Sequence, residues 1–320
     1  MKKIAAFDIG SNAIRMVIAH IEKDGVLTIR DKIRVPLRLG TEAFSQGYFS
    51  EHTMGEALRV FKKFKREIEL QEVEYYRAVA TSAYRNSGNA QDLGSRILSE
   101  TGIFIEAIDG STEASFIRMA IQTKIDLREK DYLLLDIGGG STEITYLING
   151  QEECSKSFPV GTVRLLEIGK NAEKEGLDCR KGYSLYLDEL TPHISDFFSK
   201  KCFSGKPLYV IGTGGNFKRL SKLRKKILGK KNNNMIYPED VSIMRKELES
   251  VSQLNRVKKF KLRQDRADVI IPASYIIEKV MNHYPVKKIM TPDVGLIHGL
   301  LFNVAGEGLF KFKDEVILKQ

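Results

Sequence analysis

Two glycine turns that each follow a carboxylate are the residues of this chain best suited to chemistry. Asp8 ends an apolar run and precedes Gly10, and Asp136 ends a second apolar run and precedes Gly138–Ser141. Residues without a Cβ atom let backbone N–H groups approach an anion closely, so such turns can cradle a phosphate. An ordinary glycine-rich hairpin explains one such turn alone, but the matched pair favours two related halves that face one cleft.

Neither turn is one of the two best-known phosphate loops. The sequence has no G-x-x-x-x-G-K-[ST] pattern. A strand-like run follows Gly138–Glu143, whereas a dinucleotide fingerprint opens a helix. Both turns therefore predict strand, tight turn and strand.

The two aspartates predict a metal site. A carboxylate at the end of a buried strand costs several kcal/mol unless it meets donors, water or a cation. A divalent ion shared by Asp8 and Asp136 would supply that cation, and Mg²⁺ fits best because it prefers oxygen ligands, with Mn²⁺ as the substitute. Glu143 lies seven residues after Asp136 on the return strand and can reach the same ion or its water. Asp136 acting only as a cap of its turn is the alternative.

Two further side chains are candidates for catalysis. Glu113 falls in the first turn of a helix that follows Asp109-Gly110, where favourable interaction with the helix dipole is the simpler explanation. Arg85 closes the stretch Ala80–Asn86 and could clamp a phosphate through two hydrogen bonds, although a surface salt bridge is the simpler explanation.

A third glycine turn, Gly212–Asn216, lies between a buried strand and a basic helix. The positive end of a helix N-terminus favours phosphate. Gly214, Gly215 and Asn216 are therefore candidate substrate contacts.

The elements that must position these residues indicate an α/β fold. Three strands open each half, and helices alternate with strands after them. The strands are expected at 4–8, 14–22, 26–34, 76–80, 104–108, 132–137, 143–148, 153–158, 208–211 and 286–290. The helices are expected at 52–70, 92–101, 112–123, 162–168, 180–198, 267–281 and 294–304.

The polar stretch 124–131 predicts a boundary between two domains, 1–126 and 127–296, with a C-terminal helix at about 297–320 that packs back on the first. The charged stretch 256–263 predicts a mobile, exposed connection. Pro272 indicates that the helix at 267–281 either begins near it or is kinked there.

Composition limits the class of protein. The chain has 320 residues, of which 42% are hydrophobic, and it has neither an apolar run of about 18 residues nor a signal peptide. A cytoplasmic protein that does not enter a membrane is expected. Cys154, Cys179 and Cys202 lack C-x-x-C spacing and form an odd set, which indicates reduced structural thiols.

The formal net charge of +10 predicts attraction to polyanions. Basic residues gather in 62–66, 218–231 and 256–263, but aromatic residues do not alternate with them, so no specific nucleic-acid binding is expected. The run 62–66 is interpreted as the solvated face of a helix, because apolar residues fall on the opposite side.

With these pieces in place, the chain resembles the exopolyphosphatase / guanosine pentaphosphate phosphohydrolase (Ppx/GppA) family of the actin, sugar kinase and Hsp70 superfamily. The resemblance covers nearly the whole chain and rests on ordered motifs: Phe-Asp-Ile-Gly-Ser-Asn at 7–12, Ala-Thr-Ser-Ala-Tyr-Arg at 80–85, Asp-Gly-Ser-Thr-Glu-Ala at 109–114, Asp-Ile-Gly-Gly-Gly-Ser-Thr-Glu at 136–143, Gly-Thr-Gly-Gly-Asn at 212–216 and Arg-Ala-Asp-Val-Ile at 266–270. The Gly-Gly-Gly-Ser-Thr-Glu string is the most specific.

The resemblance implies two ribonuclease-H-like domains with mixed sheets flanked by helices and an active site in the interdomain cleft. It implies that Glu113 is the base that activates the attacking water, and that Asp136 and Glu143 form the metal and water site. Phosphate contacts are implied for the following residues: Ser11, Asn12, Arg85, Gly138, Gly139, Gly140, Ser141, Gly214, Gly215 and Asn216.

Three departures from the family pattern bear on activity. Thr112 stands where the family usually has the first of two acidic residues, and Gly295-Leu296-Ile297-His298-Gly299 replaces the more usual Gly-Leu-Arg-Glu-Gly. The chain also stops at Gln320, without the additional helical domain of longer members, which puts long-chain grip in doubt.

The function hypothesis is a magnesium-dependent hydrolase that releases terminal orthophosphate from polyphosphate and from guanosine pentaphosphate, with a role in the stringent response. A homodimer is retained as a candidate oligomeric state. Two alternatives stay open: a superfamily kinase, and a nucleotide-binding regulator without turnover, which Thr112 and His298 keep in consideration.

Overall fold

A computed structural model of the chain describes residues 2–23, 25–199, 208–231, 234–284, 286–306 and 312–313. Cys202 lies outside these residues. The chain divides into two compact units: unit 1 comprises Met1–Ile125 and Val294–Gln320, and unit 2 comprises Asp126–Asp293. No helix of the described residues is long and apolar enough to span a membrane.

Unit 1 contains a mixed six-stranded sheet in the order β12-β3-β2-β1-β4-β5. Strands β1 to β3 pair antiparallel, while β4, β5 and β12 join in parallel. The strands are β1 (Lys2–Ile9), β2 (Ile14–Ile21), β3 (Leu27–Val35), β4 (Tyr75–Ala80), β5 (Glu106–Ala107) and β12 (Phe312–Lys313). The helices are α1 (Leu39–Ser45), α2 (Glu51–Leu70), α3 (Ser82–Arg85), α4 (Ala90–Thr101), α5 (Gly110–Gln122) and α14 (Leu296–Ala305).

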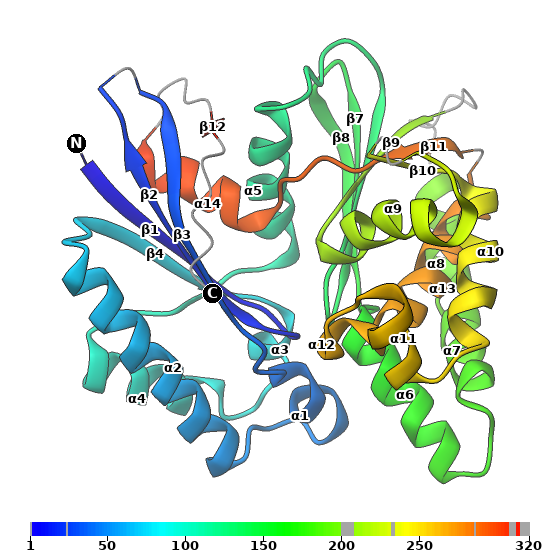
Figure 1. Cartoon of the computed structure of the whole chain (residues 1–320), viewed down its shortest axis with the longest axis horizontal. Helices are drawn as coiled ribbons and strands as arrows, with labels where there is room; N and C mark the ends of the chain where they lie inside the picture. The colour runs from blue at the N-terminus through cyan, green and yellow to red at the C-terminus, as the bar shows by residue number, and fades with distance from the viewer. Residues whose placement is uncertain are drawn as a thin grey trace. The chain divides into compact units, whose positions relative to one another are not determined.

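The core of unit 1 forms because the inward residues of β1 meet the apolar stripe of α2. Ser50 caps this helix by accepting a hydrogen bond from the backbone N–H of Thr53. Phe61 and Phe64 of the stripe are fully buried, and the ring of Phe64 lies 5.6 Å from that of Phe7. The basic residues within 62–66 lie on either side of Phe64, and Lys62, Lys63 and Arg66 are exposed, which fits the solvated face expected from the sequence. Helices α2 and α4 cover one face of the sheet, and α5 and α14 cover the other (Figure 1).

Unit 2 repeats the arrangement, with its sheet in the order β10-β11-β9-β6-β7-β8. The strands are β6 (Tyr132–Ile137), β7 (Thr142–Ile148), β8 (Gln151–Phe158), β9 (Leu208–Thr213), β10 (Met235–Ile236) and β11 (Val286–Met290). The helices are α6 (Thr162–Lys174), α7 (Cys179–Glu189), α8 (Thr191–Ser199), α9 (Gly215–Leu228), α10 (Pro238–Glu249), α11 (Gln253–Phe260), α12 (Gln264–Ala267) and α13 (Ile270–Met281).

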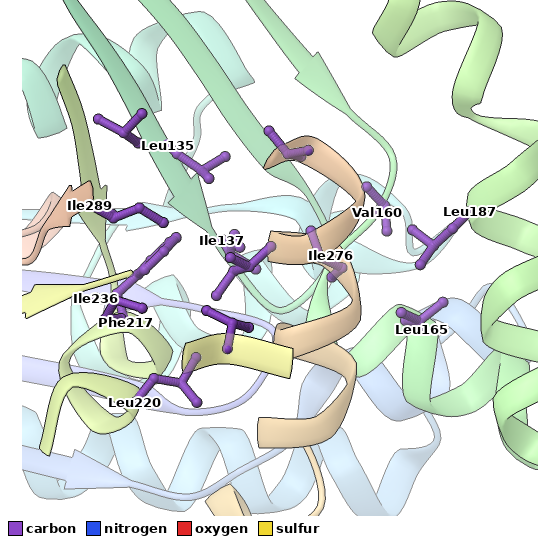
Figure 2. Packing of buried hydrophobic residues seen from close by; sticks show 14 of the residues in the cluster. Leu135, Ile137, Val160, Leu165, Leu187, Phe217, Leu220, Ile236, Ile276 and Ile289 are labelled. Atoms are coloured by element: carbon purple, nitrogen blue, oxygen red, sulfur yellow. The ribbon is translucent and has the colours of Figure 1, made fainter. Parts of the chain in front are cut away.

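Side chains of β6 divide between the two faces of this sheet. Leu135 and Ile137 point into a core that also contains Phe217 of α9 and Ile276 of α13 (Figure 2). Because successive side chains of a strand alternate, Asp136 lies on the opposite face. The prediction of an α/β fold with two mixed-sheet, ribonuclease-H-like domains flanked by helices is confirmed.

Some predicted boundaries are wrong. The helix expected at 180–198 is two helices that meet at Leu190, because Pro192 has no N–H to continue the first. The strand expected at 104–108 is limited to Glu106–Ala107, since only these residues pair with β4 at the sheet edge. Helix α14 ends at Ala305, and residues 312–313 of the range assigned to a C-terminal helix form a strand.

The charged stretch 256–263 is not a mobile connection. It contains the end of α11, and Phe260 and Leu262 are buried at 3% exposure each, which anchors the stretch to the core. Pro272 is the third residue of α13, so the helix begins near the proline and is preceded by the separate α12. Helices α1, α3, α10, α11 and α12 and strand β10 were not predicted.

Candidate active site

A polar row crosses the sheet of unit 2 on the face opposite to the core. Strand pairing places Glu143 of β7 directly beside Asp136 of β6, with Ser157 of β8 and Thr213 of β9 on the outer sides. The Ser157 hydroxyl donates to Glu143 Oε1 at 2.9 Å, and the Thr213 hydroxyl donates to Asp136 Oδ1. Both carboxylates are therefore oriented by neighbouring strands.

The two carboxylates at the centre of this row form a candidate cation site. Glu143 is 3% exposed, and carboxylate oxygens of Asp136 and Glu143 lie within 4.8 Å of each other. Like charges directly opposite on adjacent strands repel each other, and a buried carboxylate is costly without a cation. Hard oxygen donors of this kind match Mg²⁺ or Mn²⁺, so the residues present fit the predicted metal.

The loop Gly138–Ser141 is held from behind by the first turn of α6. The N–H groups of Thr162 and Val163 donate to the carbonyl oxygens of Gly138 and Gly139 at 3.0 and 2.7 Å, and Arg164 Nε donates to Gly140 O at 2.9 Å. In a trans peptide the C=O of one residue and the N–H of the residue after it point in opposite directions. The amides of residues 139–141 therefore face away from α6, as a phosphate cradle requires.

Gly161 makes this contact between α6 and the loop possible, and the sequence analysis did not identify Gly161 as a site residue. A Cβ atom at this position would lie 2.3 Å from Gly140 N and 2.6 Å from Gly139 O. The signal available in the sequence was a glycine immediately before the helix that begins at Thr162.

The third glycine turn lies beside Asp136 in the same unit. Gly214 has φ +89°, a conformation that favours glycine, and a Cβ atom there would lie 3.4 Å from Asp136 Oδ1. Arg266, 6% exposed, packs its guanidinium against Gly215 and donates from Nη1 to Asn216 Oδ1 at 3.2 Å. The motif Arg-Ala-Asp-Val-Ile at 266–270 was recognised in the sequence, but no role was assigned to Arg266.

The Asp8 turn of unit 1 has different chemistry. Asp8 is buried and lies directly opposite Arg15 on β2, whose Nη1 is 2.6 Å from Asp8 Oδ2. A cation of the chain thus already neutralises Asp8, and the charge argument for a metal at this position no longer applies. The predicted role of Asp8 as a metal ligand stays a prediction without structural support.

The residues after Asp8 still form a polar turn. Ser11 is 3% exposed and its hydroxyl makes no hydrogen bond within the described part of the chain. Asn12 Oδ1 accepts a hydrogen bond from Arg38 Nε at 2.8 Å. The N–H of Gly40 donates to Ser11 O at 2.8 Å, and a Cβ atom at Gly40 would lie 2.9 Å from Ser11 Cβ.

Glu113 and Arg85 lie together in unit 1. Glu113 is 6% exposed, and its Oε2 is 3.8 Å from Arg85 Nη1, which also donates to the carbonyl oxygen of Ile108. Asp109 caps the helix that carries Glu113, and hydrogen bonds from the Thr112 backbone N–H, with those from the Thr112 and Ser111 side chains, lower the Asp109 pKa to about 2. The structure thus gives Glu113 a buried setting with a neighbouring cation, which a helix-dipole contact alone does not require.

The unusual His298 has a local structural role. Its Nδ1 accepts the Gly295 N–H at 3.2 Å, as a third-position Glu or Gln does when it caps a helix start. Gly299 is required by close packing, because a Cβ atom there would lie 1.9 Å from the carbonyl oxygen of Phe116.

The sequence matches the Ppx/GppA phosphatase family over residues 17–307. The chain belongs to this family. Among curated relatives, it is 22% identical to Exopolyphosphatase 1 of Mycobacterium tuberculosis over 302 residues, covering 93% of this chain and 87% of the relative. It is 25% identical to Exopolyphosphatase 1 of Mycobacterium leprae over 221 residues, covering 69% of this chain and 64% of that relative. The chain thus aligns with less than two thirds of the M. leprae protein.

Solved Ppx/GppA structures share the fold. An exopolyphosphatase from Cytophaga hutchinsonii superposes with a TM-score of 0.81 at 24% identity, covering 95% of this chain and 98% of that chain. An Aquifex aeolicus Ppx/GppA family member gives 0.72 at 24% identity, covering 94% and 96%. These likenesses establish the architecture of both units, and family membership comes from the sequence match.

Proposed function

We propose that this chain is a phosphoanhydride hydrolase that releases terminal orthophosphate from inorganic polyphosphate. The observation that carries the proposal is the paired Asp136 and Glu143 beside two glycine loops, Gly138–Ser141 and Gly214–Asn216. Phosphoryl transfer needs positioning and charge neutralisation more than covalent chemistry. The loops would supply the positioning, and a cation held by the two carboxylates would supply the neutralisation. Family membership and the names of the mycobacterial relatives support polyphosphate as the substrate.

In this proposal the second unit holds the terminal phosphate. The amides of residues 139–141 and the Gly214–Asn216 loop bind its oxygens, while Asp136 and Glu143 hold Mg²⁺ or Mn²⁺. When bound, the metal neutralises negative charge on the phosphate oxygens. Thr213 and Ser157 keep the two carboxylates in place through the hydrogen bonds described above.

The first unit supplies the base. The Glu113 carboxylate takes a proton from the attacking water as the water oxygen bonds to phosphorus. The bridging P–O bond breaks, orthophosphate leaves, and the shortened chain keeps the bridging oxygen. Arg85 holds Glu113 and the phosphate from one side, and Ser11 and Asn12 offer further polar contacts.

The decisive test is Glu113→Gln, which keeps the size of the side chain and removes its basicity. Phosphate release from polyphosphate should fall about 10²- to 10⁴-fold in kcat, the range for a general base, with little change in KM. Glu69→Gln, at an exposed glutamate of α2 in the same unit, is the matched control and should keep full activity. An active Glu113→Gln enzyme would refute the assigned mechanism.

The same assay addresses the metal and the second substrate. Chelation should abolish release, and Mg²⁺ or Mn²⁺ should restore it. We propose guanosine pentaphosphate as a second substrate, hydrolysed at its terminal phosphate by the same residues. Release from polyphosphate but not from the nucleotide would restrict the function to polyphosphate.

A further inference from the structure

A row of cations extends along α9 from the Gly214–Asn216 loop. Arg219, Lys222 and Lys226 are spaced by three and four residues, which places them on one face of the helix. Lys222 and Lys226 are exposed. Within the described part of the chain, Lys222 makes no salt bridge, so its charge is available to a ligand, whereas Arg219 is also attracted by the carboxylate of Asp265.

The second basic run of the sequence lies beside this row. Lys226 Nζ donates to the carbonyl oxygen of Phe260 at 3.0 Å, which joins α9 to the end of α11. In the same segment Arg263 Nε is 3.5 Å from Asp265 Oδ1. Burial and the charge of Arg263 lower the pKa of Arg219, while the charge of Asp265 acts in the opposite direction. Because Phe260 and Leu262 are anchored in the core, the exposed Lys261 and Arg263 are presented by an ordered segment.

Arg266 joins this surface to the candidate active site. It packs on Gly215 and donates to Asn216, within the phosphate loop at the start of α9. We call the surface formed by Arg219, Lys222, Lys226, Lys261 and Arg263 the α9 ridge. From Asn216 to Lys226 the helix rises about 15 Å, at 1.5 Å per residue.

We propose that the α9 ridge binds the distal phosphates of a polyphosphate chain whose terminal phosphate lies at the Gly138–Ser141 and Gly214–Asn216 loops. The inference rests on the proposed function and adds a direction and a length dependence to it. The ridge would give this chain contacts to phosphates beyond the terminal one.

The aromatic residues argue for a phosphate chain in preference to a nucleic acid. Sequence-tolerant binding of single strands combines basic grooves with aromatic side chains on which bases stack. The large exposed aromatic side chains among the described residues are Tyr48, Tyr75, Tyr76 and Phe104, and all belong to unit 1. The ridge therefore offers charge without stacking partners.

The test is the charge reversal Lys222→Glu/Lys261→Glu, assayed with triphosphate and with long-chain polyphosphate. KM for long-chain polyphosphate should rise about tenfold or more, because exposed pairs contribute up to about 1 kcal/mol each and reversal adds repulsion. KM for triphosphate and kcat for both substrates should change less than about twofold, since Lys222 lies about 9 Å along α9 from Asn216, beyond a triphosphate bound at the loops. Added salt should raise the wild-type KM for the long chain more steeply than that for triphosphate.

Lys63→Glu/Arg66→Glu is the matched control. It makes the same change in net charge on exposed residues of α2 in unit 1. An equal rise in KM for long-chain polyphosphate in both variants would show that only net charge matters and would overturn the proposal. An unchanged KM in the ridge variant would also overturn it. A ridge variant that loses binding of single-stranded RNA but keeps its KM for long polyphosphate would also overturn it.

Failure of the proposed function can be distinguished from failure of the ridge proposal. In that case the wild-type chain would release phosphate from neither substrate. Equilibrium binding of long-chain polyphosphate then tests the ridge separately. Weaker binding by the ridge variant, but not by the control, supports the ridge, and equal binding overturns it.

Discussion

The two carboxylate-tipped hairpins share a geometry and differ in one partner. In unit 1 Asp8 faces Arg15 across β1 and β2, and in unit 2 Asp136 faces Glu143 across β6 and β7. The offset is seven residues in both hairpins, so strand pairing puts the two partners at equivalent places. One hairpin holds a salt bridge and the other holds two carboxylates.

This difference in charge indicates which of the two hairpins is suited to bind a metal ion. The Asp8 hairpin carries its own cation, and the Ser11 hydroxyl in its turn makes no hydrogen bond within the described residues. The Asp136 hairpin concentrates negative charge that a cation relieves. Each turn is also braced through a glycine, Gly40 in unit 1 and Gly161 in unit 2, so the scaffold is similar and the charge is what separates the two.

The strongest way to break the comparison is to make the second hairpin like the first. Glu143→Arg places a cation opposite Asp136, and phosphate release should fall about 10³-fold or more because a preorganised electrostatic group is lost. Mg²⁺ should no longer raise the melting temperature, measured by differential scanning fluorimetry. Glu143→Gln, which removes the negative charge at constant size, separates the loss of the carboxylate from the addition of a cation. Mg²⁺-stimulated activity in Glu143→Arg would show that the pair is not the metal site.

The reverse exchange makes the first hairpin like the second. Arg15→Glu leaves buried Asp8 without its cation and adds a like charge, so the free energy of unfolding should fall by about 3 kcal/mol in urea titrations. Asp8→Asn combined with Arg15→Gln should recover most of this loss, because no uncompensated charge remains. An unchanged stability of Arg15→Glu would show that the salt bridge is not what maintains Asp8.

The smallest expected effect tests whether Gly161 of unit 2 is needed to position the loop Gly138–Ser141. Gly161→Ala forces a methyl group against Gly139 and Gly140, which should displace the phosphate loop and lower kcat about 10- to 100-fold. Gly55→Ala in α2 is the matched control, since a Cβ atom there meets nothing within 4 Å, and it should keep its activity. Steady-state phosphate release measures both. Full activity in Gly161→Ala would mean that the loop is positioned by other contacts.

Much of the fold could be predicted because its signals are local. Apolar alternation gave the opening strands of each half, and the turns followed from glycine after a carboxylate. The stretch 256–263 was misjudged because charge dominates its composition, while Phe260 and Leu262 anchor it to residues distant in sequence. The break at Leu190 was missed although Pro192 marked it.

The residues of the candidate site also differ in how far the sequence could predict their partners. The offset that pointed to Glu143 applies equally to Arg15, so the partner of Asp8 was within reach of the sequence. Thr213 and Arg266 were not, because they meet Asp136 and Asn216 across separations of 77 and 50 residues.

The sequence by itself determined the family, the paired turns and the residue types that can hold phosphate and metal, because these depend on motifs a few residues long. Only the tertiary structure decided which charges meet. Strand register neutralises Asp8 with Arg15 and places Asp136 beside Glu143, and the packing of α9, α11 and α12 joins two separate basic runs into one ridge. Pairing across strands and helices is a matter of distance in space, which a linear pattern does not contain.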